Sequence, residues 1–398
     1  MPRARLHEFH SSRTLGPFQA LSQCEIGEYL RAFHRYQLDR NRVVIQPESP
    51  HAIGGGLNVL AVSIKDVAAK AAVSIATVSH VLNGTRITRP RTRERVLAAV
   101  VELGYSQNQA ARNLARGTSS LLGLIVSDVR NPFFPEITAA FQDQALAHEM
   151  DAIMLNTNYD AQRTLHSVRR LIGLQVPGVA VFTSQIEPSV VDILAGRHVA
   201  AVYLDLGKVA DFVSNIVLDY EHGIAQALEH LTGLGHSRIG YIGGPPKLLS
   251  IQRRKQAFID TLNRSGLDSS MAVDADFSVK GGYQACSSLL DRHSPTAIVA
   301  GNDLTAIGIL HCAYDGGLRV PEDLSVVGFD DILFAEYTQP ALTTVAVPRA
   351  EIGKTAFEAL WTMLADPELK GREYRLDTHL VTRQSTGPPQ SREARAAS

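Results

Sequence analysis

The chain has 398 residues, of which 45% are apolar and 20% are charged, and its formal net charge is −1. This length predicts two or three domains, and the composition is that of an ordinary globular protein with a sizeable core. No stretch approaches the roughly 20 apolar residues of a membrane span, and the N-terminal "MPRARLHEFHSSRTLGPF" lacks the apolar region of a secretory signal. We therefore expect a cytoplasmic protein without a membrane partner.

The three cysteines, Cys24, Cys286 and Cys312, are far apart in the sequence and form no C-x-x-C motif or Cys/His cluster. That spacing argues against a disulfide scaffold and against a zinc site, and it suits a reducing compartment. We expect no metal and no other cofactor.

Residues 1–61 show little periodic pattern. One short amphipathic helix is possible at "CEIGEYLRAFHRYQL", and the glycine-rich run "HAIGGGLNVL" lies further along. We interpret 1–61 as an N-terminal extension that is either poorly ordered or precedes the true translation start, which would then lie nearer Val59 or Val62.

The stretch 62–84, "VSIKDVAAKAAVSIATVSHVLNG", places apolar residues at helical spacing in two short groups, separated by the small-residue turn "AAVS". Two short helices joined by a tight turn are typical of a helix-turn-helix, whose second helix can enter the major groove of DNA. Ser74 is suited to cap that second helix. A third helix is expected to begin near Pro90. Its core-facing residues are Val96, Val100 and Leu103.

Positive charge is concentrated in residues 62–118, where nine Lys and Arg residues stand against three acidic ones, a local net charge of +6. Cationic surface supplies the sequence-independent part of DNA affinity. The start of the second helix carries groups that can contact base edges, thymine methyls or phosphates. These residues are Ile75, Ala76, Thr77, Ser79 and His80. Small amphipathic helices are also common in proteins that do not bind DNA, and the local charge favours the DNA-binding interpretation.

The linker "YSQNQAARNLARG" (105–117) places Ala110, Ala111 and Leu114 on one face of a helix too short to be stable alone in water. Such a helix could fold on docking, with Leu114 as an apolar wedge in a minor groove. The alternative is an ordinary interdomain linker whose leucine packs on the core, and without further context the sequence favours that alternative.

After residue 118, continuous apolar runs such as "LLGLIVS", "GVAVFTS", "TAIVAGN" and "LSVVGFDD" alternate with helix-length segments. This alternation predicts parallel sheets covered on both faces, and the number of strands favours two doubly wound subdomains. Polar residues follow several strands at the edge where open α/β sheets bind ligands. They are Ser127, Asp205, Asn302 and Asp330.

The segments "IKDVAAKAAVSIATVSHVLNG", "TRERVLAAVVELGYSQNQAARNLA", "LLGLIVSDVRNPFFPEI", "GHSRIGYIGG" and "GLRVPEDLSVVGFDD" together resemble the LacI/GalR family of bacterial transcriptional regulators. The resemblance covers about 62–389. It implies a small all-α helix-turn-helix headpiece (62–105), a hinge helix (106–118) and an α/β periplasmic-binding-protein-like effector-binding and dimerisation domain (119–389) of two doubly wound subdomains. A tail (390–398) follows. The implied partners are operator DNA, a small-molecule effector and a second copy of the chain.

The resemblance also implies DNA-contacting positions. Base-reading positions are matched by Ile75, Ala76 and His80, and phosphate-contacting positions by Thr77, Ser79, Asn83 and Thr92. Leu114 matches the hinge leucine that opens a central base step of a palindromic operator. The same DNA surface is expected to include Ser63, Ile64, Ser74, Asn108 and Ala111.

For the effector, the resemblance implies a cleft between the two subdomains. The expected lining residues are Ser127, Phe133, Phe134, Asp205, Ser250, Arg254, Phe277, Asn302 and Asp330. A guanidinium such as that of Arg254 can hold two ligand oxygens at once. Leu248 stands where some family members carry a charged ligand-binding residue, which disfavours a purine and leaves a sugar as the expected ligand. Two alternatives remain open: Asp205 and Asp330 could cap helices, and Phe134 and Phe277 could be plain core.

Two other functions are weighed against regulation. A solute-binding protein of a sugar transport system would share the cleft, yet it needs a signal peptide and has no headpiece. An enzyme is disfavoured because no dinucleotide fingerprint, Walker loop, nucleophile elbow or H-E-x-x-H motif is present. Four histidines without an evident nucleophile partner are expected at the surface or in helix caps, and we expect no catalytic residue. They are His166, His222, His230 and His236.

The linker yields the first prediction. If Leu114 wedges into the minor groove, then Leu114→Ala should keep the fold and dimerisation but lose most specific operator binding and much of the DNA bend, because bending depends on the easily unstacked central step. An affinity and bending assay of both proteins on one operator measures this. A variant that binds and bends the operator like the wild type would make the hinge a simple tether.

Overall fold

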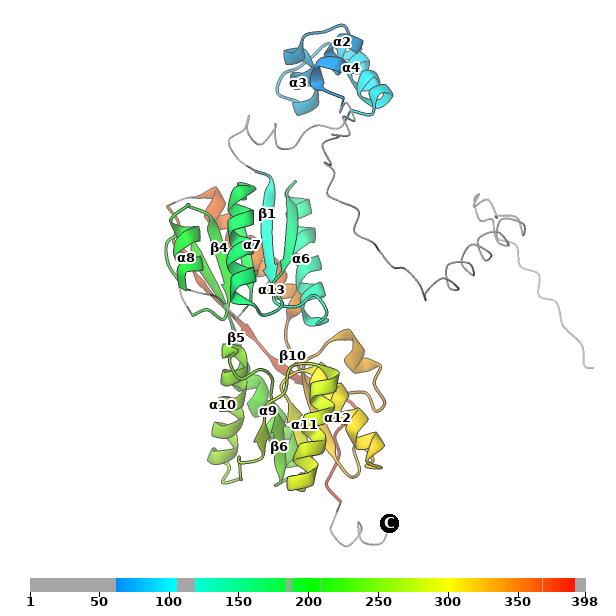
Figure 1. Ribbon diagram of the computed structural model, residues 1–398, viewed down its shortest axis with the longest axis vertical. Helices are drawn as coiled ribbons and strands as arrows, with labels where there is room; N and C mark the ends of the chain where they lie inside the picture. The colour runs from blue at the N-terminus through cyan, green and yellow to red at the C-terminus, as the bar shows by residue number, and fades with distance from the viewer. Residues whose placement is uncertain are drawn as a thin grey trace, which may run out of the picture. The chain divides into compact units, whose positions relative to one another are not determined.

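The computed structural model describes residues 62–105, 119–183, 186, 188–207, 209–366 and 368–390. The extension 1–61, the linker 106–118 with Asn108, Ala111 and Leu114, and residues 391–398 lie outside this description. The chain divides into two compact units at about residue 106. Each unit is considered by itself (Figure 1).

The described residues of the first unit form three helices: α2 (Ile64–Lys70), α3 (Ile75–Asn83) and α4 (Pro90–Leu103). Ser63 and Asp66 form a reciprocal capping box at the start of α2, and Ser74 caps α3 by accepting a hydrogen bond from the Thr77 amide, as predicted. Pro90 is the first residue of α4, also as predicted. The predicted three-helix core is confirmed. Its buried members are Val67, Ala68, Ala71, Val78, Val96 and Ala99.

The second unit contains two six-stranded sheets among its described residues. The first sheet has the order β11-β5-β4-β3-β1-β2, and every strand pair is parallel. Its strands are β1 (Leu121–Val126), β2 (Asp151–Asn156), β3 (Gly178–Phe182), β4 (Ala200–Leu204), β5 (Val213–Asp219) and β11 (Glu373–Asp377). Its helices are α6 (Phe133–Ala147), α7 (Ala161–Gly173), α8 (Pro188–Ala195) and α13 (Arg349–Ala365). We call this sheet with its helices the N-subdomain.

The second sheet has the order β12-β10-β9-β8-β6-β7. Its strands are β6 (Ile239–Ile242), β7 (Ala272–Val273), β8 (Ala297–Ala300), β9 (Ser325–Asp330), β10 (Thr343–Ala346) and β12 (His379–Val381). Its helices are α9 (Tyr220–Gly233), α10 (Leu249–Arg264), α11 (Val279–Arg292) and α12 (Asp303–Asp315), with a 3-10 turn η1 (Leu333–Glu336). We call this group the C-subdomain. The expectation of parallel sheets fails at one strand, because β12 pairs antiparallel with β10.

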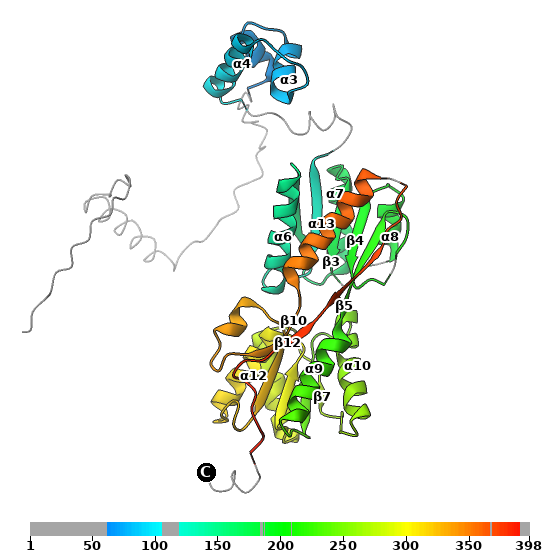
Figure 2. The same cartoon turned by 180° about the vertical axis from the view of Figure 1, so that it is seen from behind.

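Helices cover both faces of each sheet, as the continuous apolar strands predict (Figure 1 and Figure 2). Two successive residues of β1 illustrate this: Leu124 belongs to the cluster that contains α6 and α13 residues, and Ile125 to the cluster with α7 and α8 residues. The chain passes between the subdomains three times, from β5 to α9, from β10 to α13 and from β11 to β12. The cleft between the subdomains therefore lies beside these three crossings.

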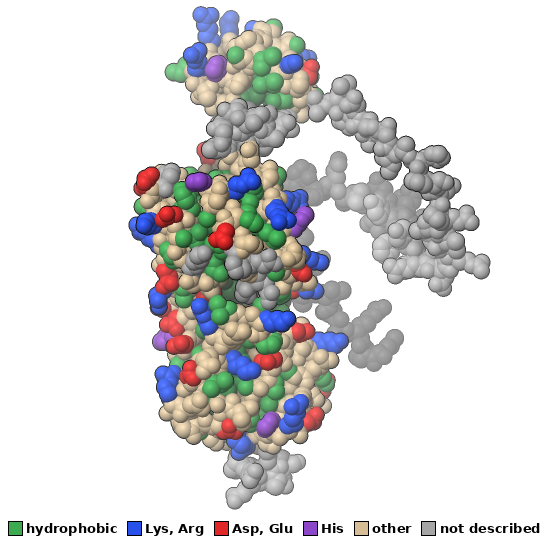
Figure 3. All heavy atoms as spheres, turned by 60° about the vertical axis from the view of Figure 1, so that its left-hand side comes forward, with side chains coloured by type: hydrophobic (Ala, Val, Ile, Leu, Met, Phe, Trp, Pro, Cys, Tyr) green, Lys and Arg blue, Asp and Glu red, His purple; other side chains and the backbone are tan. Residues whose placement is uncertain are grey.

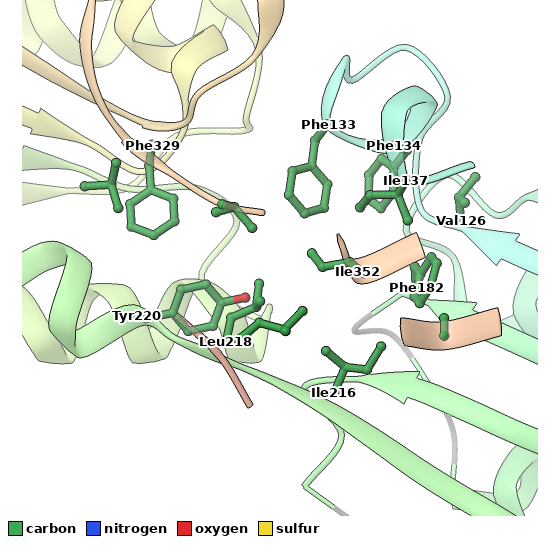
Figure 4. Close-up of a cluster of buried hydrophobic side chains, with 14 of the residues drawn as sticks. Val126, Phe133, Phe134, Ile137, Phe182, Ile216, Leu218, Tyr220, Phe329 and Ile352 are labelled. Carbon is green, nitrogen blue, oxygen red and sulfur yellow. The ribbon is translucent and has the colours of Figure 1, made fainter. Parts of the chain in front are cut away.

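One apolar cluster extends across both subdomains (Figure 4). In Figure 4, Phe329 and Tyr220 of the C-subdomain lie on one side, and Phe133 and Phe134 of α6 lie on the other. All four side chains are buried. The aromatic groups around the cleft are thus continuous with the core, which fixes their positions.

His236 contradicts the expectation that it lies at the surface or in a cap. It is 3% exposed, its Nδ1 lies 2.9 Å from Thr296 Oγ1, and its Nε2 lies 2.9 Å from the Gly387 carbonyl oxygen. Because a carbonyl only accepts, Nε2 carries the proton and Nδ1 accepts from the threonine. Burial lowers the pKa of His236, which favours this neutral form. This histidine holds the C-terminal segment against β9.

Candidate DNA-contacting helix and ligand pocket

The first turn of α3 presents the residues that the sequence singled out for DNA. Ile75 is 45% exposed and Ala76 is exposed, whereas Val78 faces the headpiece core. Thr77, Ser79 and His80 are half-buried beside them. Lys and Arg predominate among the charged side chains visible on the headpiece in Figure 3. The helix therefore offers small apolar and hydroxyl groups within a cationic surface, which suits a major groove.

His80 is held in place by the loop after α3. Its Nδ1 lies 2.8 Å from the Thr85 hydroxyl, and one turn along, Asn83 Nδ2 donates to Ser79 Oγ at 3.1 Å. With Nδ1 occupied, Nε2 is the ring atom left for an external partner. The imidazole is therefore positioned before any DNA arrives, which reduces the entropy lost on binding.

Three of the expected DNA-binding residues also have structural roles. Ser63 is used in the capping box, and Ile64 is half-buried against the headpiece core. Ser74 caps α3 through its hydroxyl, which also lies 2.9 Å from Thr77 Oγ1. Thr92 is half-buried in the first turn of α4.

Arg95 is a headpiece residue that sequence reasoning missed. Its guanidinium donates from α4 to the Ala71 carbonyl (Nη2 at 2.5 Å) and to the Ala72 carbonyl at 3.0 Å. These carbonyls lie at the end of α2, where the turn places Ala72 at a φ of 50° in the left-handed region. Arg95 therefore fixes the turn that sets the angle between α2 and α3. Arg95 lies 24 residues from Ala71 and 23 from Ala72, and no sequence motif predicts a contact over that separation.

The second unit contains a pocket between its subdomains. The pocket is lined by Ser127, Asn131, Phe133, Phe134, Tyr159, Phe182, Thr183, Leu204, Asp205, Tyr220, Leu248, Ser250, Arg254, Phe277, Asn302 and Asp330. All nine residues expected to bind an effector are among them. Ser127, Asp205, Asn302 and Asp330 follow or end strands β1, β4, β8 and β9, so the carboxyl ends of both sheets meet at this cleft.

Arg254 is the central charged group of the pocket. Its guanidinium carbon lies 4.0 Å from the centre of the Phe329 ring and 4.8 Å from that of Tyr220, and Nη1 donates to the Gly301 carbonyl at 2.5 Å. Nη2 is 3.5 Å from Asp330 Oδ1, which is long for a hydrogen bond. The residue is 5% exposed. Packing against both rings fixes the cation. Part of its hydrogen-bond donor set is left unused, since Nε has no partner among the described residues.

Asp330 is 3% exposed at the end of β9. Burial raises the pKa of its carboxyl to about 6, against the opposing effect of the Arg254 and Arg349 guanidinium groups. Arg349 also donates to the Asp330 backbone carbonyl and, through Nε, to Glu136 of α6 at 2.7 Å. Arg349 thereby links the two subdomains behind the pocket.

Asp205 connects the subdomains at the opposite wall. Its carboxylate accepts from the Leu218 amide at 3.2 Å and from the Tyr220 hydroxyl at 2.5 Å, and it lies 3.3 Å from Arg253 Nη1 of α10. Burial raises the pKa of Asp205 in spite of these partners. Neither Asp205 nor Asp330 caps a helix, so that alternative is wrong for both; Asn302 does cap α12, through a bond from the Thr305 amide at 2.9 Å.

The apolar walls come from both subdomains. Phe133 and Phe134 meet edge to face with ring centres 5.1 Å apart. Across the cleft, Phe277 lies 6.4 Å from the Tyr159 ring and packs so closely on Gly244 that a Cβ there would lie 2.5 Å from its ring. Phe134 is both core and pocket wall, so its two interpretations do not exclude one another. Phe277 lines the pocket but is half-buried and belongs to none of the apolar core clusters of the described residues, so plain core is wrong for it.

Three polar atoms in this pocket have no hydrogen-bond partner within the described chain. They are Arg254 Nε, Asn302 Nδ2 and Asp330 Oδ1. A buried polar atom left unpaired costs about 1–3 kcal/mol, and native structures rarely keep several together without a function. A further sign of stored strain is the left-handed φ of Asp205 (58°), Phe277 (64°) and Asp330 (111°).

Sequence reasoning missed part of the lining. Asn131, Phe182 and Thr183 lie beside predicted strand ends or next to the phenylalanine pair and could have been found from that position. Tyr159 and Tyr220 could not, because their relation to the pocket depends on long-range packing. Sequence reasoning selected Arg254 and not the adjacent Arg253. Of these two arginines, Arg253 is the one that forms an ion pair with Asp205.

Two possible features are absent from the described residues. They contain no group of three or more His, Cys, Asp or Glu side chains able to hold a metal ion. No helix among them is long and apolar enough to cross a bilayer.

A helix-turn-helix unit followed in the same chain by a two-subdomain α/β unit with a polar cleft defines a ligand-responsive DNA-binding regulator. Comparison with known proteins agrees. The family described as "Bacterial regulatory proteins, lacI family" matches residues 63–108, and the "Periplasmic binding protein-like domain" matches residues 228–386. The HTH-type transcriptional repressor PurR of Photobacterium profundum is 32% identical over 327 residues, which cover 81% of this chain and 98% of that protein.

Solved structures show the same architecture. The Lac repressor dimer bound to operator and the anti-inducer ONPF superposes with a TM-score of 0.73 at 29% identity, covering 82% of this chain and 99% of that one. The complex of the transcriptional regulator CelR with cellobiose gives 0.62 at 29% identity, covering 81% and 99%. The chain belongs to the LacI family of bacterial transcriptional regulators. These relatives are regulators rather than enzymes, and nothing among them favours a transport protein.

The Arg95 contacts generate a stability prediction. Arg95→Met keeps the aliphatic stem but removes the donors to Ala71 and Ala72, so the turn should lose about 1 kcal/mol of local stability. Hydrogen exchange of the α2 amides in the full-length protein measures this and should accelerate roughly fivefold. Arg93→Met, on the exposed side of the same helix, is the matched control. Equal exchange in both variants would show that Arg95 does not fix the turn.

Proposed function

We propose that this chain is a repressor that binds a palindromic operator as a homodimer and responds to a sugar or related polyhydroxyl metabolite held in its inter-subdomain cleft. The headpiece comprises 62–105, the hinge 106–118 and the effector-binding domain 119–389. The observation that carries the ligand part is the set of unpartnered polar atoms of Arg254, Asn302 and Asp330 in one pocket.

The chemistry of those atoms favours a neutral ligand with several hydroxyls. Arg254 Nε and Asn302 Nδ2 are donors that need acceptors, and Asp330 Oδ1 is an acceptor that needs a donor. A hydroxyl is both donor and acceptor, so neighbouring hydroxyls of one sugar can satisfy all three. The cleft carries two carboxylates, Asp205 and Asp330, against Arg253 and Arg254, which leaves no excess charge for an anion. The cellobiose seen with CelR is a ligand of the same class.

The aromatic walls support the same class. Sugar rings present apolar C–H faces that pack on aromatic faces, and Phe133, Phe134 and Phe277 supply such faces around the polar groups. Leu248, buried at 2% exposure, adds an apolar surface where some family members carry a charged ligand-binding residue, which disfavours a purine.

The headpiece geometry supports operator recognition. A group of exposed apolar side chains on the C-subdomain supports dimerisation. Leu333, Phe334 and Tyr337 in and after η1 are 66%, 53% and 73% exposed on the C-subdomain. Large apolar side chains exposed together mark an interaction surface, and a palindrome requires two headpieces. The Lac repressor was solved as a dimer on its operator.

The test of the proposal is a ligand screen coupled to DNA binding. Purified protein is heated with sugars, nucleosides and phosphorylated metabolites, and a stabilising compound is then added to an operator selected from random DNA. We expect a sugar to raise the melting temperature and to change operator affinity, and Arg254→Met to abolish both effects. Stabilisation by a nucleoside or a phosphorylated compound alone would overturn the sugar assignment.

His80 generates a prediction for the DNA side. With Nδ1 held by Thr85 and Nε2 directed to a base, His80→Ala should weaken operator binding by about 1–3 kcal/mol and random-DNA binding much less. The comparison is a pair of titrations at one salt concentration. Thr92→Ala, at a phosphate-contacting position, is the control and should weaken both complexes alike. Equal losses for His80→Ala on both DNAs would remove its base-reading role.

Asp330 generates a pH prediction. A sugar hydroxyl that donates to the carboxylate binds its deprotonated form, so the complex has a lower Asp330 pKa than the value of about 6 in the free protein. Sugar affinity should therefore be highest above pH 6 and should fall as pH drops below 6, by up to about tenfold per pH unit. The charged groups around this carboxyl are the guanidinium groups of Arg254 and Arg349. Asp303 also lies nearby, and burial raises the pKa of its carboxyl well above the usual range.

Calorimetric titration of the screened sugar at pH 5 and pH 7.5 measures this dependence. Asp330→Asn should bind more weakly and lose the pH dependence, because its amide does not titrate. Asp331→Asn, the neighbouring residue outside the pocket lining, should keep the dependence. A wild-type affinity that is the same at both pH values would contradict a hydroxyl bond to the Asp330 carboxylate.

A further inference from the structure

Helices α11 and α12 pack on each other with almost no side chains between them. A Cβ on Gly308 of α12 would lie 2.1 Å from the Val279 carbonyl oxygen and 3.0 Å from the carbonyl carbon of Gly282. A Cβ on Gly282 of α11 would lie 2.3 Å from the Thr305 carbonyl oxygen. The two helix backbones therefore touch at Gly282 and Gly308. Both helices lie between parallel strands on one face of the sheet, so they run in the same direction.

One helical turn beyond each glycine stands a cysteine. The sequences are "GYQAC" in α11 and "GILHC" in α12, so Cys286 and Cys312 repeat the register of Gly282 and Gly308. Residues four apart lie on the same face of a helix. The two side chains therefore face each other where the helices are close, and each thiol affects the pKa of the other. Both are free thiols in this structure.

The two thiols differ in access. Cys286 is 0% exposed, whereas Cys312 is 6% exposed and lines a surface groove with Tyr283, Asp315 and Leu318. Burial raises the pKa of both thiols, and the hydrogen bond from Cys286 partly offsets this at Cys312. Cys312 is thus the thiol that a small reagent reaches first and that ionises more readily.

We propose that Cys286 and Cys312 are a redox modification site that closes to an intramolecular disulfide on exposure to a small hydroperoxide. The Cys312 thiol first loses its proton to solvent, its thiolate attacks one peroxide oxygen, the O–O bond breaks, and the alkoxide or hydroxide leaving group takes up a proton from solvent. Cys312 then carries a sulfenic acid. Cys286 attacks the Cys312 sulfur, the S–O bond breaks, and water leaves with the Cys286 proton. Two electrons pass from the cysteines to the peroxide, and an external dithiol reverses the reaction by exchange.

The position of this pair gives the modification a route to the ligand pocket. Helix α11 begins two residues after Phe277, and α12 is capped by Asn302, and both residues line the pocket. A disulfide fixes the separation of the two helices and hence of these two pocket residues. The reaction itself requires no effector, so its test is independent of the proposed ligand.

The experiment uses the full-length protein with Cys24→Ala, so that only the pair remains, and hydrogen peroxide as the probe. Free thiols are alkylated after denaturation, and intact mass is measured. We expect both thiols to be lost together with a mass decrease of two hydrogens per chain, full recovery with dithiothreitol, and a rate that rises between pH 7 and pH 9 because the thiolate is the nucleophile. The oxidised protein should also melt at a higher temperature than the reduced protein.

Single variants separate the two roles. Cys286→Ala should stop at a sulfenic acid on Cys312 that dimedone traps, and Cys312→Ala should leave Cys286 unreacted while the protein stays folded. If Cys286→Ala does not fold, Cys286→Val fills the same apolar site. The proposal would be overturned if both thiols of the folded Cys24→Ala protein could still be fully alkylated after treatment with peroxide. So would a disulfide that joins two chains, or direct conversion of Cys312 to the sulfinic acid.

Discussion

The burial of the Arg254 guanidinium against the adjacent rings of Phe329 and Tyr220 is the arrangement on which the ligand cleft depends. Removing a charge from water costs several kcal/mol unless partners replace the lost hydration. Here the replacement is incomplete, because Nε is unpaired and the nearest carboxylate oxygen, on Asp330, is 3.5 Å away. A protein selected for stability alone would shorten that pair or substitute apolar residues. The loose arrangement is therefore best explained as a site that a ligand completes, since the ligand oxygens supply the missing acceptors.

The same cleft is crossed by bonds that join the subdomains without a ligand. Arg253 of α10 pairs with Asp205 of the N-subdomain, and Arg349 links Glu136 of α6 to the Asp330 carbonyl. A ligand that takes up Asp205 or Asp330 competes with these bonds or adds to them. It changes the equilibrium between subdomain arrangements only by the difference in its affinity for each. The extent to which a ligand shifts this equilibrium thus depends mainly on pocket residues that contact both subdomains. Residues that line only one wall of the pocket contribute less.

Much of this could be foreseen from the sequence, and the limits have physical causes. Helix caps, continuous apolar strands and polar residues at strand ends are local signals, and Ser74, Pro90 and the four strand-end residues lie where those signals place them. The sequence does not single out β7, β10, β11 and β12, because strands of two to five residues have weak periodicity. It does not single out β5 either, because the buried polar residues Ser214 and Asn215 interrupt its apolar run. The Asp205–Tyr220 bond, the Arg95 contacts and the buried His236 depend on side chains brought together by the tertiary fold. The match of Leu114 to the hinge stays a prediction, since it lies outside the described residues.

The route from the cleft toward the linker is constrained by β1. This strand begins at Leu121, shortly after the linker 106–118, and ends at Val126, immediately before the pocket residue Ser127. Its residues from Leu122 onward are buried, and it is paired on both edges with β2 and β3 over a length of ~20 Å. Sliding β1 within the sheet would break those pairings and repack the core, so a ligand cannot move the linker by shifting this strand alone. It can do so by moving the N-subdomain as a rigid body relative to the C-subdomain at the three crossings. In the proposed dimer, such a motion changes the separation of the two linker attachment points, so the proposed coupling between ligand and operator belongs to the dimer and not to a single chain.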